Sequence, residues 1–277
     1  MRVFTMPTRL AALLLASTLL VGCASNGNEE QEEEEADEFA GVSESELYEE
    51  SREALEGGSY TTAITQLEAL DTRFPFGDRA EQAQLELIYA YYETDDWEAT
   101  RAAASRFIRL HPSHPQADYA LYMRGLASWQ AGRFSLERLR LIDISKRDLG
   151  ASRDAYNDFR ELIRLYPDSE YAPDAEQRLI YLRNILARHE LHVADFYLRK
   201  GAYLAAVERG RWVVENYPRA EATSDALAVM VEGYLGLEML DRARESLEVL
   251  IENTPNHERL NGRTFRPQHV DADSLSV

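Results

Sequence analysis

The sequence predicts an all-α protein, built as a right-handed solenoid of about five helical hairpins. Five prolines recur at the ends of amphipathic segments, separated by 37, 55, 51 and 37 residues: Pro75, Pro112, Pro167, Pro218 and Pro255. Apolar or small residues lie twelve, eight and five positions before each proline. Spacings of four and three place these side chains on one face of a helix.

The residue twelve positions before each proline is small or short: Ala63, Thr100, Ala155, Ala206 and Ala243. Such a residue lets the two helices of a hairpin approach closely, and the proline ends the second helix because it has no N–H to donate. The pattern resembles the tetratricopeptide repeat, with insertions that relax its period of about 34 residues. We therefore expect five helix pairs in residues 45–256, with a non-repetitive helical bundle as the alternative.

Two repeats depart from this pattern. An insertion of mixed apolar and charged residues, 132–150, separates the two expected helices of the third repeat. In the fourth repeat, residues 174–200 contain neither glycine nor proline, so they form either one long helix or two closely joined ones. Gly57-Gly58 and Gly201 fall where turns between paired helices are expected, because a positive φ is easily adopted by glycine.

The amino terminus has the features of a lipoprotein signal peptide. Arg2 and Arg9 flank the start of an apolar run of eleven residues, which is too short to span a bilayer of about 30 Å. The run leads through Val21-Gly22 to Cys23, the only cysteine in the chain. We expect residues 1–22 to be removed. Cys23 would then carry S-diacylglycerol and N-acyl chains such as palmitate, with no other cofactor.

An acidic tether follows in residues 23–44. Eight acidic side chains crowd between Glu29 and Glu38, and such a run repels itself and has little to bury, so we expect a disordered spacer. An interaction tail for basic partners is the alternative. Ala24, rather than Asp, follows the cysteine, as in lipoproteins sorted to the outer membrane of Gram-negative bacteria, and we expect the protein on its periplasmic face.

The charge balance argues against nucleic acid as a partner. Removal of residues 1–22 leaves 28 basic and 49 acidic side chains, a net charge of −21. Nucleic-acid binding requires clustered Lys and Arg that displace counterions.

Catalytic motifs do not stand out, and we predict that the chain is not an enzyme. It lacks a glycine-rich phosphate loop, an HExxH motif and a Gly-x-Ser-x-Gly motif. His189 and His192 share a helix face, but no nearby residues complete a metal-ligand set. We therefore expect no metal site.

Several short segments are more specific than the repeat pattern requires: Ala63 to Asp71, Arg73-Phe74-Pro75-Phe76-Gly77, Leu87 to Tyr92, Arg106 to Leu110, His114-Pro115 and Tyr119 to Leu126. With these segments the sequence resembles the BamD family of outer-membrane β-barrel assembly lipoproteins. The resemblance extends from Cys23 to about Pro255. It implies a lipid-anchored scaffold of the BAM complex that binds unfolded outer-membrane proteins and promotes their folding and insertion into the outer membrane.

The resemblance also implies two divided roles. Residues 45–130 would bind the substrate, near Tyr60, Phe74, Phe76 and Gly77. Residues 170–256 would bind the periplasmic domains of BamA and other BAM lipoproteins, with Arg209 at the contact. The insertion departs from the family at Lys146 and Leu149, and the tail 257–277 extends beyond it and is expected to be flexible.

The residues themselves suggest further substrate contacts. Tyr89, Tyr91 and Tyr92 offer aromatic surface for a chain that ends in an aromatic residue. Arg73, Arg106 and Arg109 are candidates for binding its terminal carboxylate, although tyrosines at this spacing are also typical of a helical core. The alternative function is a periplasmic repeat lipoprotein that coordinates cell-wall synthesis with envelope constriction.

Overall fold

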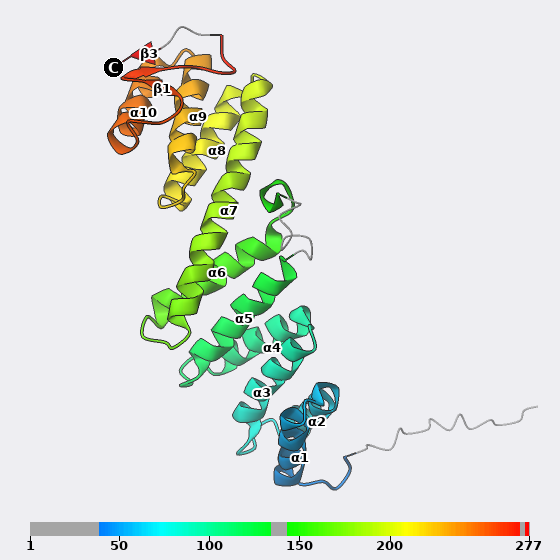
Figure 1. Cartoon of the computed structure of the whole chain (residues 1–277). Helices are drawn as coiled ribbons and strands as arrows, with labels where there is room; N and C mark the ends of the chain where they lie inside the picture. Colours follow the sequence, from blue (N-terminus) through cyan, green and yellow to red (C-terminus); the bar gives the residue numbers. More distant parts are fainter. Residues whose placement is uncertain (1–38, 134–142, 272–274, 277) are drawn as a thin grey trace, which may run out of the picture. The chain divides into compact units, whose positions relative to one another are not determined.

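The computed structural model describes residues 39–133, 143–271 and 275–276, and residues 41–277 belong to one compact unit. The predicted signal peptide, Cys23 and residues 24–38 of the predicted tether lie outside the described residues. Within these residues the chain forms ten α-helices, a 3-10 turn (η2) and three short strands (Figure 1). The helices are α1 (Glu44–Glu56), α2 (Tyr60–Arg73), α3 (Ala80–Glu93), α4 (Trp97–Leu110), α5 (Ala117–Ala131), α6 (Gly150–Leu165), α7 (Ala172–Arg199), α8 (Tyr203–Asn216), α9 (Thr223–Gly236) and α10 (Leu240–Asn253).

Each helix packs on the next one along the chain, and α3 also touches α5 while α7 touches α9. This arrangement is that of consecutive hairpins, and the predicted all-α fold of five repeats is confirmed for the described residues. Residues 174–200 lie in the single 28-residue helix α7, which settles the open question about the fourth repeat.

The predicted close-contact positions are buried in every repeat. All five small residues have no exposed surface: Ala63, Thr100, Ala155, Ala206 and Ala243. The residues eight and five positions before each proline are buried as well, among them Leu67, Phe159 and Val213. The second helix of each hairpin therefore packs through the face that its sequence predicts.

The proline stops also act as predicted. The helices α2, α4, α6, α8 and α10 each end two residues before the proline. The amide of the residue between, such as Phe74, still donates to the carbonyl four residues back at 2.8 Å, and the proline then ends the ladder because it lacks an N–H.

Turns within the hairpins share one left-handed residue. Gly58 and Gly201 occupy it with φ of +72° and +71°, as the sequence predicts. Asp95 and Glu238 occupy the same place in two other repeats with φ of 60° and 59°. These two positions cannot be recognised from the sequence, because Asp and Glu, unlike glycine, do not signal a positive φ.

The insertion of the third repeat is described from Asp143 onward. Its 3-10 turn η2 (Ile144–Lys146) packs on α7. There His189 Nδ1 lies 2.7 Å from the Ser145 carbonyl oxygen, and His192 Nε2 lies 2.9 Å from the Ser145 hydroxyl. The two histidines thus hold the end of the insertion. Among the described residues no group of three or more His, Cys, Asp or Glu side chains is arranged to hold a metal ion.

The prediction of a flexible tail after Pro255 is wrong for the described residues of this segment, which are folded. Strands β1 (Leu260–Asn261), β2 (Thr264–Phe265) and β3 (Leu275–Ser276) form an antiparallel sheet in the order β1-β2-β3. Phe265 and Leu275 are buried in the core formed with α9 and α10. These two apolar side chains have no helical period, so the repeat pattern did not reveal them.

We predict that Gly201→Ala lowers the free energy of unfolding by about 1–2 kcal/mol, because an L side chain at positive φ crowds its own backbone. Chemical denaturation of the mature protein measures the change. Gly150→Ala is the matched control, since Gly150 begins α6 and its added methyl group would lie no closer than 3.6 Å to another atom. Equal losses of unfolding free energy in the two variants would contradict the positive φ of Gly201 as the cause.

Candidate interaction surfaces

An open groove of about 390 Å³ lies between α1, α3 and α5, the first helices of the first three hairpins. Its lining combines apolar and aromatic side chains with three charged ones: Leu55, Leu85, Tyr89, Tyr119, Arg52, Glu56 and Glu86. The second helices pack behind these three through their small residues, so the groove is a product of the repeat geometry. Such a lining suits a peptide segment that carries an aromatic side chain.

Glu86 organises the polar part of this groove. Its Oε1 accepts hydrogen bonds from Tyr48 Oη at 3.0 Å, Arg52 Nη1 at 2.8 Å and Gln82 Nε2 at 3.0 Å. Burial raises the pKa of Tyr48, and its hydrogen bond to Glu86 adds to the effect. The hydrogen bonds of Arg52 to Glu86 and Glu56 raise the pKa of the guanidinium, which therefore stays charged. Sequence reasoning missed this pair, since 34 residues separate the partners.

Tyr60 lies beside the groove. Its ring meets that of Tyr89 edge to face, with 6.0 Å between the ring centroids. Their hydrogen bond, together with burial, raises the pKa of Tyr89 to about 12. Tyr60 begins α2 and Tyr89 lies near the end of α3, so the contact ties the second helix of the first repeat to the groove.

Phe74, Phe76 and Gly77 form a separate surface at the opposite end of α2. The helix has 14 residues, so the two ends are about 20 Å apart at 1.5 Å per residue. Phe76 is 99% exposed at the tip of the turn. A side chain at Gly77 would collide with the Glu44 carboxylate, which accepts a hydrogen bond from the Arg79 amide at 2.7 Å. The four predicted substrate residues therefore belong to two surfaces.

The other candidates from the sequence are engaged elsewhere. Arg106 forms an ion pair with Asp71. Arg73 lies over the ring of Phe74, with its Cζ 6.0 Å from the centroid. Tyr91 donates to Glu68. Among these tyrosines and arginines, Tyr89 alone belongs to the described lining of the groove, whose own arginine is Arg52.

Arg209 lies on α8 and is half-exposed. Its Nη1 is 2.7 Å from Oε2 of Glu190, a buried acid on α7. The hydrogen bond to Glu190 raises the pKa of the guanidinium. Trp212, three residues further on, is exposed, and an exposed tryptophan beside an arginine is typical of residues that dominate protein interfaces.

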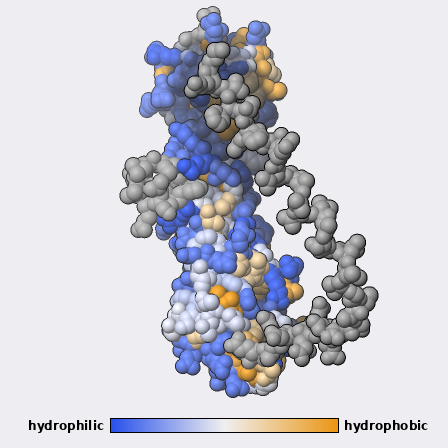
Figure 2. All heavy atoms as spheres, turned by 90° about the vertical axis from the view of Figure 1, so that its right-hand side faces the viewer, coloured by the Kyte–Doolittle hydropathy of each residue, from blue (hydrophilic) through white to orange (hydrophobic). Residues whose placement is uncertain are grey.

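The exposed apolar residues are otherwise scattered. Figure 2 shows one face of the molecule, on which hydrophobic residues form small patches among hydrophilic ones. No helix in the described part of the chain combines the length and the apolar content needed to cross a membrane.

Comparison with known proteins places this chain among outer-membrane lipoproteins. The family model described as "YfiO: Outer membrane lipoprotein" matches residues 41–250. The outer membrane protein assembly factor BamD of Vibrio cholerae is 41% identical over 237 residues, covering 86% of this chain and 95% of that protein. BamD of Neisseria gonorrhoeae is 37% identical over 240 residues, covering 85% and 87%. A tetratricopeptide repeat protein from Parabacteroides merdae aligns with 76% of this chain and 79% of its own, at 14% identity and a TM-score of 0.36.

The contact between Tyr60 and Tyr89 can be tested by titration. We predict that Tyr60→Phe lowers the pKa of Tyr89 from about 12 toward the ordinary tyrosine value of about 10, because the hydrogen bond to Tyr60 is the largest cause of the shift. Carbon-13 tyrosine labelling and NMR titration measure it, with Tyr203→Phe as a control on α8. An unchanged Tyr89 pKa in Tyr60→Phe would refute the contact.

Proposed function

Because this chain belongs to the YfiO family of outer membrane lipoproteins, we propose that it acts as an outer membrane protein assembly factor, the function named for its relatives. The observation that carries this proposal is the 41% identity over 95% of the Vibrio cholerae protein. It favours β-barrel assembly over the alternative of coordinating cell-wall synthesis. The chain is then a member of the BAM complex, associated with the outer membrane, and works as a scaffold rather than an enzyme.

The attachment to the membrane is assigned to Cys23. A diacylglyceryl thioether and an N-acyl chain there would hold the protein on the periplasmic face, because acyl chains contribute roughly 0.8 kcal/mol for each buried methylene. The support is the sequence Leu20-Val21-Gly22-Cys23 and the residue Ala24 that follows it.

The substrate surface is assigned to the first three repeats. The groove between α1, α3 and α5 offers aromatic walls and the ion pair of the exposed Arg52 with the buried Glu86, which suit the aromatic end of an unfolded outer-membrane protein. Phe76, fully exposed about 20 Å away along α2, offers a second apolar contact for the same extended chain. An extended segment of six or more residues reaches both, at about 3.3 Å per residue.

We predict that replacing Phe74 and Phe76 with Ala weakens binding of a peptide from the carboxyl terminus of an outer-membrane β-barrel protein by roughly tenfold, the loss of about 1.4 kcal/mol of apolar contact. Helicity should be unchanged, because Phe76 contributes nothing to the core. Fluorescence anisotropy with a labelled peptide measures binding, and circular dichroism measures helicity.

Two comparisons sharpen that experiment. Phe76→Ala alone isolates the exposed ring from the partly buried Phe74. Leu240→Ala with Val249→Ala removes two exposed apolar side chains from α10 and should leave binding intact. Undiminished binding by the Phe74 and Phe76 double variant would exclude this loop from the substrate surface.

The partner surface is assigned to Arg209 and the exposed face of α8, which would contact the periplasmic domains of BamA.

We predict that Arg209→Glu abolishes recovery of BamA when the membrane-extracted protein is pulled down, because the change reverses the charge at the contact. Arg242→Glu, an exposed arginine on α10, is the charge-matched control and should retain BamA.

The Arg209→Glu variant also sets a carboxylate against the buried Glu190, so a second variant separates binding from folding. Arg209→Gln keeps a hydrogen-bond donor for Glu190 and removes only the charge; we expect it to reduce BamA recovery while the protein stays folded. Full recovery with both variants would keep the assembly role and exclude Arg209 from the contact.

A further inference from the structure

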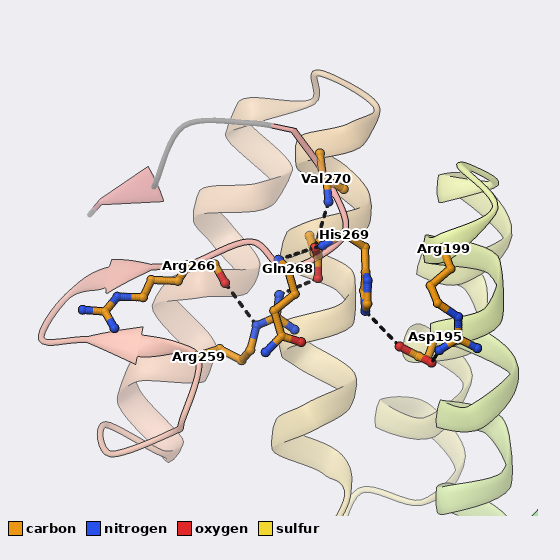
Figure 3. A network of polar contacts seen from close by, with 8 residues as sticks. Asp195, Arg199, Arg259, Arg266, Gln268, His269 and Val270 are labelled. Atoms are coloured by element: carbon orange, nitrogen blue, oxygen red, sulfur yellow. Dashed lines mark hydrogen bonds and ion pairs between the residues drawn. The ribbon is translucent and has the colours of Figure 1, made fainter.

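The folded tail is locked onto α9 by one carboxylate. Glu232 is fully buried, and its side chain accepts from Arg259 and from the backbone amides of Gln268, His269 and Val270 (Figure 3). Burial alone would raise the pKa of Glu232, but the His269 amide and the Arg259 guanidinium hold it below its usual range. The carboxylate is therefore charged, and all four of these partners come from the tail.

The tail also reaches two helices through histidines. His257 Nδ1 accepts from the Arg259 amide at 3.2 Å, so its Nε2 carries the proton that Asp225 Oδ1 of α9 accepts at 3.0 Å. His269 Nε2 lies 3.0 Å from Asp195 Oδ1 on α7. Residues 257–270 are thus held in place against both the fourth and the fifth repeat.

Between α7, α9 and this tail lies an open pocket of about 400 Å³. Its apolar part comes from α7 and α9, and the tail supplies one wall: Leu191, Ala228, Val229, His257, Glu258 and Arg259. The tail wall lies beyond residues 41–250, the part of the chain that the family model matches. Only this wall of the pocket is therefore outside the residues that the family model matches.

The charges around the pocket are unbalanced. Four carboxylates line it, from three segments of the chain: Asp195, Glu221, Asp225 and Glu258. Of its two arginines, Arg259 is neutralised by Glu232 outside the lining, and Arg188 lies 3.7 Å from Glu221. Asp195 forms an ion pair with Arg199 of α7, so the negative charge in excess comes from Asp225 and Glu258. The remaining excess of negative charge, placed around an apolar floor, matches a side chain with a long apolar stem and a cationic end.

We propose that this pocket binds a lysine side chain presented by another subunit of the assembly complex, an inference that rests on the proposed function. The aliphatic stem would lie on Leu191, Ala228 and Val229, and the ammonium would reach the carboxylates. Lysine fits better than arginine because the carboxylates come from three different segments of the chain. A compact ammonium with three rotatable donors can meet dispersed acceptors, whereas a guanidinium requires a planar pair.

A zero-length cross-link tests this directly. A carbodiimide joins a carboxylate to a lysine amine only where the two touch, and the linked peptides identify both residues by mass spectrometry. The experiment uses the whole complex extracted from membranes. This chain has only two lysines, Lys146 and Lys200, so a link to any other lysine comes from another subunit.

We expect Glu221, Asp225 or Glu258 to be linked to a lysine of a co-purified subunit. Glu221→Lys with Glu258→Lys should abolish the link at the unchanged Asp225 and reduce recovery of that subunit. Glu252→Lys, on an exposed position of α10, is the control and should change neither. Glu232→Gln, which removes the lock of the tail, should also abolish the link although every carboxylate of the pocket is intact.

Two results overturn the proposal. Pocket carboxylates that link only to Lys146 or Lys200 would indicate a contact within the chain or between two copies of it. A complex that retains its subunits while none of the three carboxylates is linked would exclude the pocket and leave the proposed function standing. Absence of any assembly subunit from the preparation would instead refute the proposed function and the inference together.

Discussion

The close contact between paired helices is the constraint on which the rest of this structure depends. In each hairpin one small residue on the second helix is completely buried, and a proline sets the end of that helix twelve residues later. The contact fixes how near the two helices lie, and the proline fixes where the chain turns toward the next repeat. The first helices of three consecutive repeats thereby come together as the walls of one groove, a surface that no single hairpin could form.

Along the chain, buried acidic side chains also join neighbouring elements by forming ion pairs with arginines. The pairs are Arg52–Glu86, Arg124–Asp158, Arg209–Glu190 and Arg259–Glu232. Removing the arginine of such a pair leaves a buried carboxylate without its charged partner, which destabilises the fold. Arg124 and Arg259 are largely enclosed, whereas Arg52 and Arg209 keep nearly half of their side chains exposed. Three of the four pairs, those of Arg52, Arg209 and Arg259, lie at the surfaces proposed to bind partners, which couples the stability of the fold to the shape of those surfaces.

Sequence reasoning succeeded where the signal is local and repeated. The spacing of Ala206, Gly210 and Val213 before Pro218 is enough to place α8 and its buried face, and the same holds in the other repeats. It failed where the partners are distant. No pattern in the sequence around Glu232 indicates that the backbone amides of residues 268–270 donate hydrogen bonds to its carboxylate. The sequence alone therefore predicts a flexible tail. Likewise the family resemblance places Tyr60 and Phe76 together on the substrate side, whereas the length of α2 separates them.

We conclude that this protein serves the assembly of outer-membrane β-barrels. This function is tested by depleting the protein in its own bacterium. Folded β-barrel proteins are then quantified through their heat-dependent migration in gels. We expect folded barrels to disappear from the outer membrane as the protein is depleted, while the cell-wall synthases remain in place. Normal amounts of folded barrels, accompanied by a failure of envelope constriction, would contradict it and favour the cell-wall alternative.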